Sequence, residues 1–184
     1  MKSFLLAFIF SLFFTLTAQA QWWAGGYASY WDTGDFGETF GGGFVTHWKA
    51  HKFLAVEGRG VWYEDTDGPE GEQIETATLG IGPAVTVPLC EKVTGYGSIV
   101  PTLFMYARDF VVDGEEVIDD DSVDFAVTFT GGLRVALTSK WSLLSEAYYN
   151  MVTVDTKAVR DGMIVDDEIE LDGFGFNIGI GYSW

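Results

Sequence analysis

The last twelve residues, which read GFGFNIGIGYSW, constrain the fold of this chain more than any other stretch. Side chains alternate across a β-strand with a period of two. One face of this segment is therefore wholly apolar and aromatic, and the other carries only glycines, Asn177 and Ser183. Such small residues are needed where side chains converge on the axis of a narrow barrel. We therefore expect a strand whose apolar face lies outside a closed sheet and whose small face lies inside it.

The same alternation runs through most of the chain and predicts eight strands. They are residues 22–31, 39–48, 53–64, 74–88, 93–108, 123–137, 141–152 and 169–184. Tight connections at 49–52, 89–92 and 138–140 alternate with longer ones at 32–38, 65–73, 109–122 and 153–168. Short turns on one side and long loops on the other are typical of outer-membrane barrels. The expected fold is all-β: an eight-stranded antiparallel up-and-down transmembrane β-barrel with tight periplasmic turns and long acidic extracellular loops.

The first twenty residues differ in character from this pattern. They contain Lys2, an apolar run over residues 4–14 and the sequence Ala18-Gln19-Ala20. These features predict a signal peptide over residues 1–20, cleaved near Ala20. A retained helical anchor is the less favoured alternative, because the apolar run is shorter than the roughly 20 residues that a spanning helix needs. The barrel domain is then residues 21–184.

Charge is distributed unevenly between the connections. The chain has 27 acidic and 10 basic residues, a net charge of −17. The longer connections and adjoining strand ends hold 24 of the acids, whereas the tight turns are rich in lysine. This balance argues against nucleic acid as a partner. We expect no cofactor beyond weakly bound divalent cations at the acidic loops, because carboxylates are hard oxygen ligands. These loops offer only weak candidate ligands, which are Asp113, Glu115, Glu116, Asp119, Asp120 and Asp121.

Alternation alone does not distinguish a membrane barrel from a lipocalin-like soluble barrel, which has its apolar face inside. Aromatic residues on the proposed outer face gather at the strand ends, as in the two interfacial girdles of membrane barrels. The opposite face carries ionisable groups in mid-strand, where a lipocalin would hold an apolar ligand. Both features favour the membrane barrel. The predicted girdle residues are Trp22, Trp48, Trp62, Trp141, Tyr182 and Trp184.

Four charged residues are predicted to point into the barrel: Glu57, Arg59, Arg134 and Glu146. Unpaired charges in a narrow interior are costly, so we expect one ion-pair network in which Glu57 reaches across the lumen to Arg134. Such a network would fill and fix the interior, since side chains can fill a barrel of eight strands. The alternative is a gate whose opening admits ions.

The sequence offers no catalytic residues. His47 and His51 are the only histidines, and we place both at the first tight turn with no carboxylate nearby. Neither begins the His-x-Ser motif of outer-membrane lipid A deacylases. Ser145 and Glu146 point to opposite faces because they are adjacent in a strand. Cys90, the one cysteine, lies beside Glu91, which does not favour a reactive thiolate.

The chain resembles the small eight-stranded outer-membrane barrels, the group that includes the OmpA transmembrane domain and OmpX. The resemblance rests on the opening QWWAGGYASYW, the strand–turn rhythm, interior Glu57, Arg134 and Glu146, and the closing GFGFNIGIGYSW. It implies a porin-like barrel in a Gram-negative outer membrane. The implied partners are membrane lipid, lipopolysaccharide and the assembly machinery that reads a C-terminal strand ending in an aromatic residue. It also implies a role in envelope integrity or adhesion.

Three functional hypotheses follow. The first is a non-enzymatic barrel with a structural or surface-interaction role, whose acidic loops contact ions, lipopolysaccharide or an extracellular macromolecule. The second is a narrow ion-conducting pore gated by the interior ion-pair layer. The third is a lipid-modifying outer-membrane enzyme, which would need a nucleophile and a base that the sequence does not provide.

Overall fold

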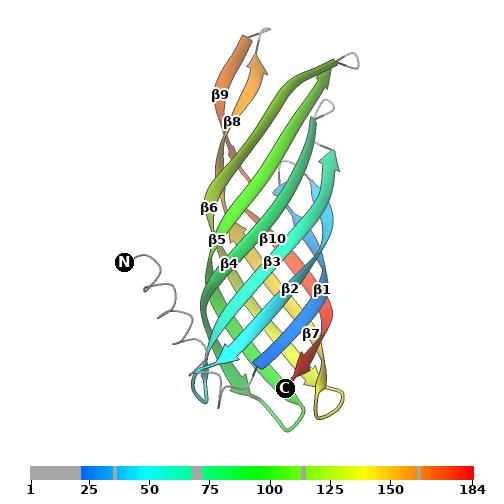
Figure 1. Cartoon of the computed structure of the whole chain (residues 1–184), viewed down its shortest axis with the longest axis vertical. Helices are drawn as coiled ribbons and strands as arrows, with labels where there is room; N and C mark the ends of the chain where they lie inside the picture. Colours follow the sequence, from blue (N-terminus) through cyan, green and yellow to red (C-terminus); the bar gives the residue numbers. More distant parts are fainter. Residues whose placement is uncertain (1–21, 35–36, 68–71, 113–114, 161–162) are drawn as a thin grey trace, which may run out of the picture.

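Eight strands close into a barrel in which each strand pairs antiparallel with both neighbours (Figure 1). The computed structural model describes residues 22–34, 37–67, 72–112, 115–160 and 163–184, with side chains described outside 65–74, 108–122 and 155–169. The predicted signal peptide, residues 1–20, lies outside these ranges. Within them, no helix has the length and apolar character needed to cross a membrane.

The strands are β1 (Trp22–Asp32), β2 (Glu38–Lys49), β3 (Leu54–Asp67), β4 (Glu72–Pro88), β5 (Val93–Val112), β6 (Glu115–Ala136), β7 (Trp141–Met151), β8 (Thr153–Arg160), β9 (Met163–Glu170) and β10 (Gly173–Ser183). The barrel order is β1-β10-β7-β6-β5-β4-β3-β2, so β10 closes the sheet against β1. β8 and β9 form a separate two-stranded sheet. The predicted eight-stranded up-and-down barrel is confirmed.

Alternation along the strands sorts side chains between an apolar exterior and a filled interior. In β10, Phe174, Phe176 and Ile178 are exposed, whereas Gly175 and Asn177 between them are buried. The outer faces of β4 and β6 are likewise apolar, with Leu79, Ile81, Phe125 and Phe129 exposed. A contiguous apolar exterior is what a barrel presents to lipid.

The interior positions of β10 are glycine because aromatic rings of the adjacent strands occupy the space that a side chain would need. A Cβ atom at Gly181 would lie 2.1 Å from Cζ2 of Trp23 on β1, and one at Gly175 would lie 2.1 Å from Cζ of Tyr148 on β7. A side chain at either position would therefore overlap a ring that fills the barrel. This close approach explains the small face of the C-terminal strand.

The strands extend further at one end than the sequence predicted. Of the predicted loops 65–73, 109–122 and 153–168, the described part is almost entirely strand. β3 and β4 still pair at Asp67 and Gln73, and β5 and β6 pair as far as Val112 and Glu115. The expectation of long loops was wrong here, because it equated polar side chains with irregular backbone. A backbone ladder needs only a partner strand, and polar side chains can face water on both sides of it.

The two ends of the barrel are therefore unlike. The tight turns and the end of β10 lie together at the bottom of Figure 1, and β5, β6, β8 and β9 project furthest at the top. In this fold short turns face the periplasm and the long end faces outward. We refer to these as the periplasmic end and the projecting end.

Aromatic pairs lie near both ends of the apolar exterior. Ring centroids are 6.0 Å apart for Trp22 and Trp48, 5.1 Å for Trp141 and Tyr182, and 5.9 Å for Tyr182 and Trp184, all near the periplasmic end. Toward the projecting end Tyr149 contacts Phe174, with centroids 4.6 Å apart, and Trp62 is 64% exposed. These aromatic residues thus lie near both ends of the apolar exterior, and their assignment to interfacial girdles stays a prediction.

Candidate functional site

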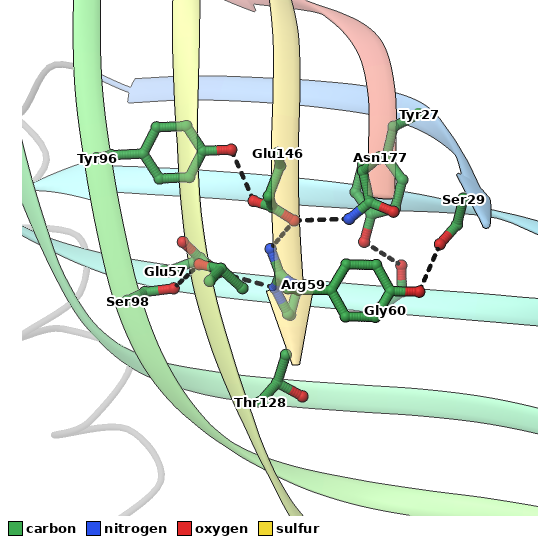
Figure 2. Close-up of polar contacts among 12 residues, drawn as sticks. Tyr27, Ser29, Glu57, Arg59, Gly60, Tyr96, Ser98, Thr128, Glu146 and Asn177 are labelled. Carbon is green, nitrogen blue, oxygen red and sulfur yellow. Dashed lines mark hydrogen bonds and ion pairs between the residues drawn. The ribbon is translucent and has the colours of Figure 1, made fainter. Parts of the chain in front are cut away.

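The most distinctive part of the interior is a buried layer of charged and polar side chains (Figure 2). Its charged members are Glu57 and Arg59 on β3 and Glu146 on β7, none more than 3% exposed. All three lie on the inward face that alternation dictates. The layer therefore links strands on opposite sides of the barrel.

Arg59 is the centre of this layer because it bonds to both carboxylates. Its Nε donates to Glu57 Oε1 at 2.8 Å and its Nη2 donates to Glu146 Oε1 at 2.7 Å. Glu57 and Arg59 are two residues apart on one strand, so they share a face, and the bond to Glu146 crosses the lumen. Among the sequence-predicted interior charges, the structure brings these three together.

Besides Ser98, which hydrogen-bonds to Glu57 (Figure 2), three further side chains bond to the carboxylates. His47 Nε2 lies 2.7 Å from Glu57 Oε2. The Tyr96 hydroxyl donates to Glu146 Oε2 at 2.6 Å, and Asn177 Nδ2 donates to Glu146 Oε1 at 2.6 Å. We call these six residues (His47, Glu57, Arg59, Tyr96, Glu146 and Asn177) the interior network. Each carboxylate oxygen accepts at least one bond, which is what makes buried charges tolerable.

Arg134 is placed apart from this network, contrary to the expected Glu57–Arg134 ion pair. Its guanidinium lies over the rings of Trp23 and Tyr96, at 4.9 and 5.5 Å from the centroids. The reason is strand register. Glu146 pairs with Gly132, whereas Arg134 pairs with Leu144 and so lies two residues nearer the turn. No ion pair is formed by Arg134 with any residue that the structure describes.

Above the network, toward the projecting end, the lumen is filled by aromatic rings and hydroxyl groups. The hydroxyls of Tyr63 and Tyr148 lie 2.7 Å apart, and Ser29 Oγ lies 3.1 Å from that of Tyr148. Trp31 packs on Tyr63 and Phe104, with centroids 5.0 and 6.0 Å away. We call Trp31, Tyr63, Phe104 and Tyr148 the aromatic plug. All four are at least 96% buried, so the interior is closed by packing as well as by charge.

The arrangement offers no metal centre within the described residues, because no group of three or more His, Cys, Asp and Glu side chains converges there. The acidic candidates Asp113, Glu115, Glu116, Asp119, Asp120 and Asp121 all lie outside the described side chains. The divalent-cation hypothesis therefore stays a prediction. Glu57 and His47 form a carboxylate–imidazole pair, but no described side chain is hydrogen-bonded to His47 Nδ1, so the pair has no nucleophile to activate.

His47, Tyr96 and Asn177 belong to the network but were not predicted from the sequence. His47 was expected at a turn without a carboxylate, whereas it is buried and pairs directly in register with Glu57. The signal was available: His47 is two residues from inward-facing Val45, so alternation alone places it inside. Asn177 lies on the glycine face of β10, where it is the one polar side chain able to reach the axis.

Comparison with solved structures identifies the fold. The chain is similar to Neisserial surface protein A (TM-score 0.62, 12% identity, 90% of this chain and 97% of that one). It is also similar to the outer membrane protein AlkL (0.60, 17%, 90% and 90%). The third is Ail, the attachment invasion locus protein of Yersinia pestis (0.52, 12%, 90% and 97%). No protein-family model matches the chain, and no curated protein sequence matches it.

These likenesses extend over nearly the whole barrel at low identity, so they describe architecture. The chain has the fold of the small eight-stranded outer-membrane barrels, as its sequence resemblance implied. The apolar exterior and the aromatic pairs near its two ends agree with that fold. The Gram-negative outer-membrane location that the sequence resemblance implied stays a prediction.

Proposed function

We propose that this barrel is a non-enzymatic, structural or surface-interacting component of the outer membrane, and that it acts through the strands that project beyond its apolar exterior. The observation that carries the proposal is a closed interior joined to a long projecting sheet. The network and the aromatic plug occupy successive levels of the lumen, while β5 and β6 stay paired up to Val112 and Glu115.

The projecting sheet has properties suited to contact with molecules outside the cell. It presents strands of paired backbone rather than free loops, so its surface is defined without a partner. It is also acidic: the strand segment Glu115 to Asp124 alone contains six carboxylates. Like charge at this density discourages self-association. Lipopolysaccharide bridged by divalent cations and a basic extracellular macromolecule are the proposed partners. Two of the similar structures are proteins named for the surface and for attachment, which is the same class of role.

A narrow ion-conducting pore is the second candidate. One observation favours it: a cavity of about 540 Å³ extends from the periplasmic turns as far as His47, so part of a path already exists. Conduction would then require the network and the aromatic plug to separate. Because both are almost wholly buried and hydrogen bonds join members within each of them, we rank this candidate below the first.

The experiment that separates the two is single-channel recording of the refolded protein in planar bilayers, with Glu57→Ala as the matched variant. The proposal expects a silent membrane for both proteins, with folding shown by heat-modifiable migration in gels. Discrete openings that change in Glu57→Ala would overturn it in favour of the pore.

A second experiment addresses the projecting end directly. Val152 and Leu171 are joined by a backbone hydrogen bond of 3.0 Å, so a two-residue turn can replace residues 153–170. Cells expressing this variant should lose adhesion to epithelial monolayers, or lose Mg²⁺-dependent retention of lipopolysaccharide, while the barrel still folds. Unchanged adhesion and retention would remove the β8–β9 hairpin from the proposed surface.

A further inference from the structure

The cavity at the periplasmic end has a chemistry that the proposed function does not use. Its wall includes Lys92 and Lys140 from the tight turns and Lys49 from the end of β2. Deeper in the barrel it reaches Arg134 and His47. It thus runs from solvent to the lower side of the interior network, with a volume of about 540 Å³. This volume is in the range of small-molecule sites.

The wall of this cavity is positively charged in a strongly acidic protein. Four basic side chains line it, against Glu91 as the one acidic side chain. If a carboxylate on Trp184 is also counted, the basic groups in the wall still outnumber the acidic ones. None of Lys49, Lys92, Arg134 and Lys140 forms an ion pair with a described residue. Four of the chain's ten basic residues therefore face one cavity without an ion pair to any described residue.

The deeper part of the same cavity contains polar atoms without hydrogen-bond partners. Three such atoms belong to residues that line it: Thr86 Oγ1, His47 Nδ1 and Arg134 Nε, none bonded within the described part of the chain. Thr86 and His47 are each only 2% exposed. Most buried polar groups in proteins have a hydrogen-bond partner. Three polar atoms without one at a single cavity therefore indicate that a ligand supplies the missing bonds. Thr86 and Arg134 are donors, and His47 Nδ1 is a donor in the imidazolium form.

We propose that this cavity binds a phosphate group from the periplasmic side. A tetrahedral oxyanion presents several acceptor oxygens, which suits a wall of guanidinium, ammonium and hydroxyl donors. The aromatic side chains of Trp22, Trp23 and Trp184 line the same cavity and leave room for an apolar part of the ligand. The phosphate can come from a free phosphate compound or from the headgroup of an anionic lipid in the inner leaflet.

The primary test is calorimetric titration of the protein with inorganic phosphate in dodecyl maltoside micelles, which contain no phosphate. We expect saturable binding with a Kd of about 1 mM or tighter. The double variant Lys92→Gln/Lys140→Gln should weaken binding roughly tenfold or more, because charge-assisted hydrogen bonds are lost. Both lysines are exposed, so this variant should fold.

The matched control is Lys52→Gln. Lys52 belongs to the same end of the barrel and carries the same charge, but it lies over the ring of Phe53 and does not line the cavity. The affinity of the Lys52→Gln variant for phosphate should stay within about twofold of that of the parent protein. Absence of saturable binding by the folded parent, or an equal loss in Lys52→Gln, would overturn the proposal.

A second arm distinguishes the sources of the phosphate group. Phosphatidylglycerol is added to the micelles and the phosphate titration is repeated. If a lipid headgroup occupies the cavity, the lipid should compete and lower the apparent affinity for inorganic phosphate in the parent and equally in Lys52→Gln. If a free compound is the ligand, the lipid should have no effect on the parent. This site is independent of the projecting end, so its failure leaves the proposed function standing.

Discussion

At the scale of single residues, the interior depends on one guanidinium shared by two carboxylates. Arg59 bonds to Glu57 and Glu146, and both acids also accept from neutral groups. Two carboxylates and one guanidinium thus share a layer that is almost wholly buried. Removing the only cation of this layer would leave two buried carboxylates facing each other without a counter-charge.

We therefore predict that Arg59→Met lowers the free energy of unfolding by about 3–5 kcal/mol, the usual cost of breaking a buried ion pair. Urea titration of the barrel in phospholipid vesicles measures this loss. Arg134→Met is the matched control: Arg134 is half-buried, forms no ion pair with described residues, and should cost clearly less. Equal losses in the two variants would contradict the central role of Arg59.

A second prediction at this scale concerns Gly175. Gly175→Ala should lower the free energy of unfolding by about 1–3 kcal/mol, as overpacking does. The added methyl group overlaps the Tyr148 ring, and that ring is held by hydrogen bonds to Ser29 and Tyr63 and cannot move freely.

The control for Gly175→Ala is Gly42→Ala. Gly42 is exposed on the outer face, and the nearest atom to its added methyl, the Tyr27 carbonyl oxygen, is 3.8 Å away. This variant should be neutral or slightly stabilising in the same urea titration. A Gly175→Ala barrel as stable as Gly42→Ala would show that Tyr148 repacks without cost.

At the scale of elements, the barrel and the β8–β9 hairpin are separable. β7 and β10 pair from Tyr182↔Trp141 to Gly173↔Asn150, and the Val152–Leu171 hydrogen bond closes this ladder beyond Gly173. β8 and β9 then pair only with each other as a sheet. The hairpin therefore extends the molecule without being part of the closed ladder.

Replacing residues 153–170 by a two-residue turn removes no barrel hydrogen bond, but it removes Val154, which is 1% exposed and belongs to the core. We therefore expect the barrel to fold with a free energy of unfolding lower by about 1–3 kcal/mol, the contribution of one buried aliphatic side chain. Heat-modifiable migration and urea titration check this. Aggregation, or loss of the folded band, would show instead that the hairpin supports β6, which β8 contacts.

At the scale of the whole molecule, the two ends differ in charge and in length. Lysines and the phosphate-binding cavity lie at the periplasmic end, and most of the carboxylates lie toward the projecting end. This asymmetry fits an outer-membrane barrel whose acidic, projecting end faces the exterior and whose lysine-rich end faces the periplasm.

The orientation can be measured through Cys90, the single cysteine of the chain, which is exposed in a periplasmic turn. A membrane-impermeant maleimide should label Cys90 only after the outer membrane is permeabilised. In a Cys90→Ser background, Glu38→Cys at the start of β2 should be labelled in intact cells, because it is exposed at the opposite end. Labelling of Cys90 in intact cells would reverse the orientation assigned here.

The sequence by itself determined which way side chains face and where the tight turns lie. Alternation is a local property with a period of two, so it placed Glu57, Arg59 and Glu146 inside and the apolar residues of β10 outside. It also placed the periplasmic strand ends at 88, 93, 137 and 141 within one residue of their observed positions.

Only the tertiary structure decided the axial level of each side chain and the true length of the strands. The level depends on the register between strands, which is a non-local quantity: a shift of two residues separates Arg134 from Glu146 and leaves Arg59 as the shared cation. Strand length depends on whether a partner backbone is present. Residues 115–122 are mostly polar by composition and still form a ladder with residues 106–112, because the two strands continue to face each other.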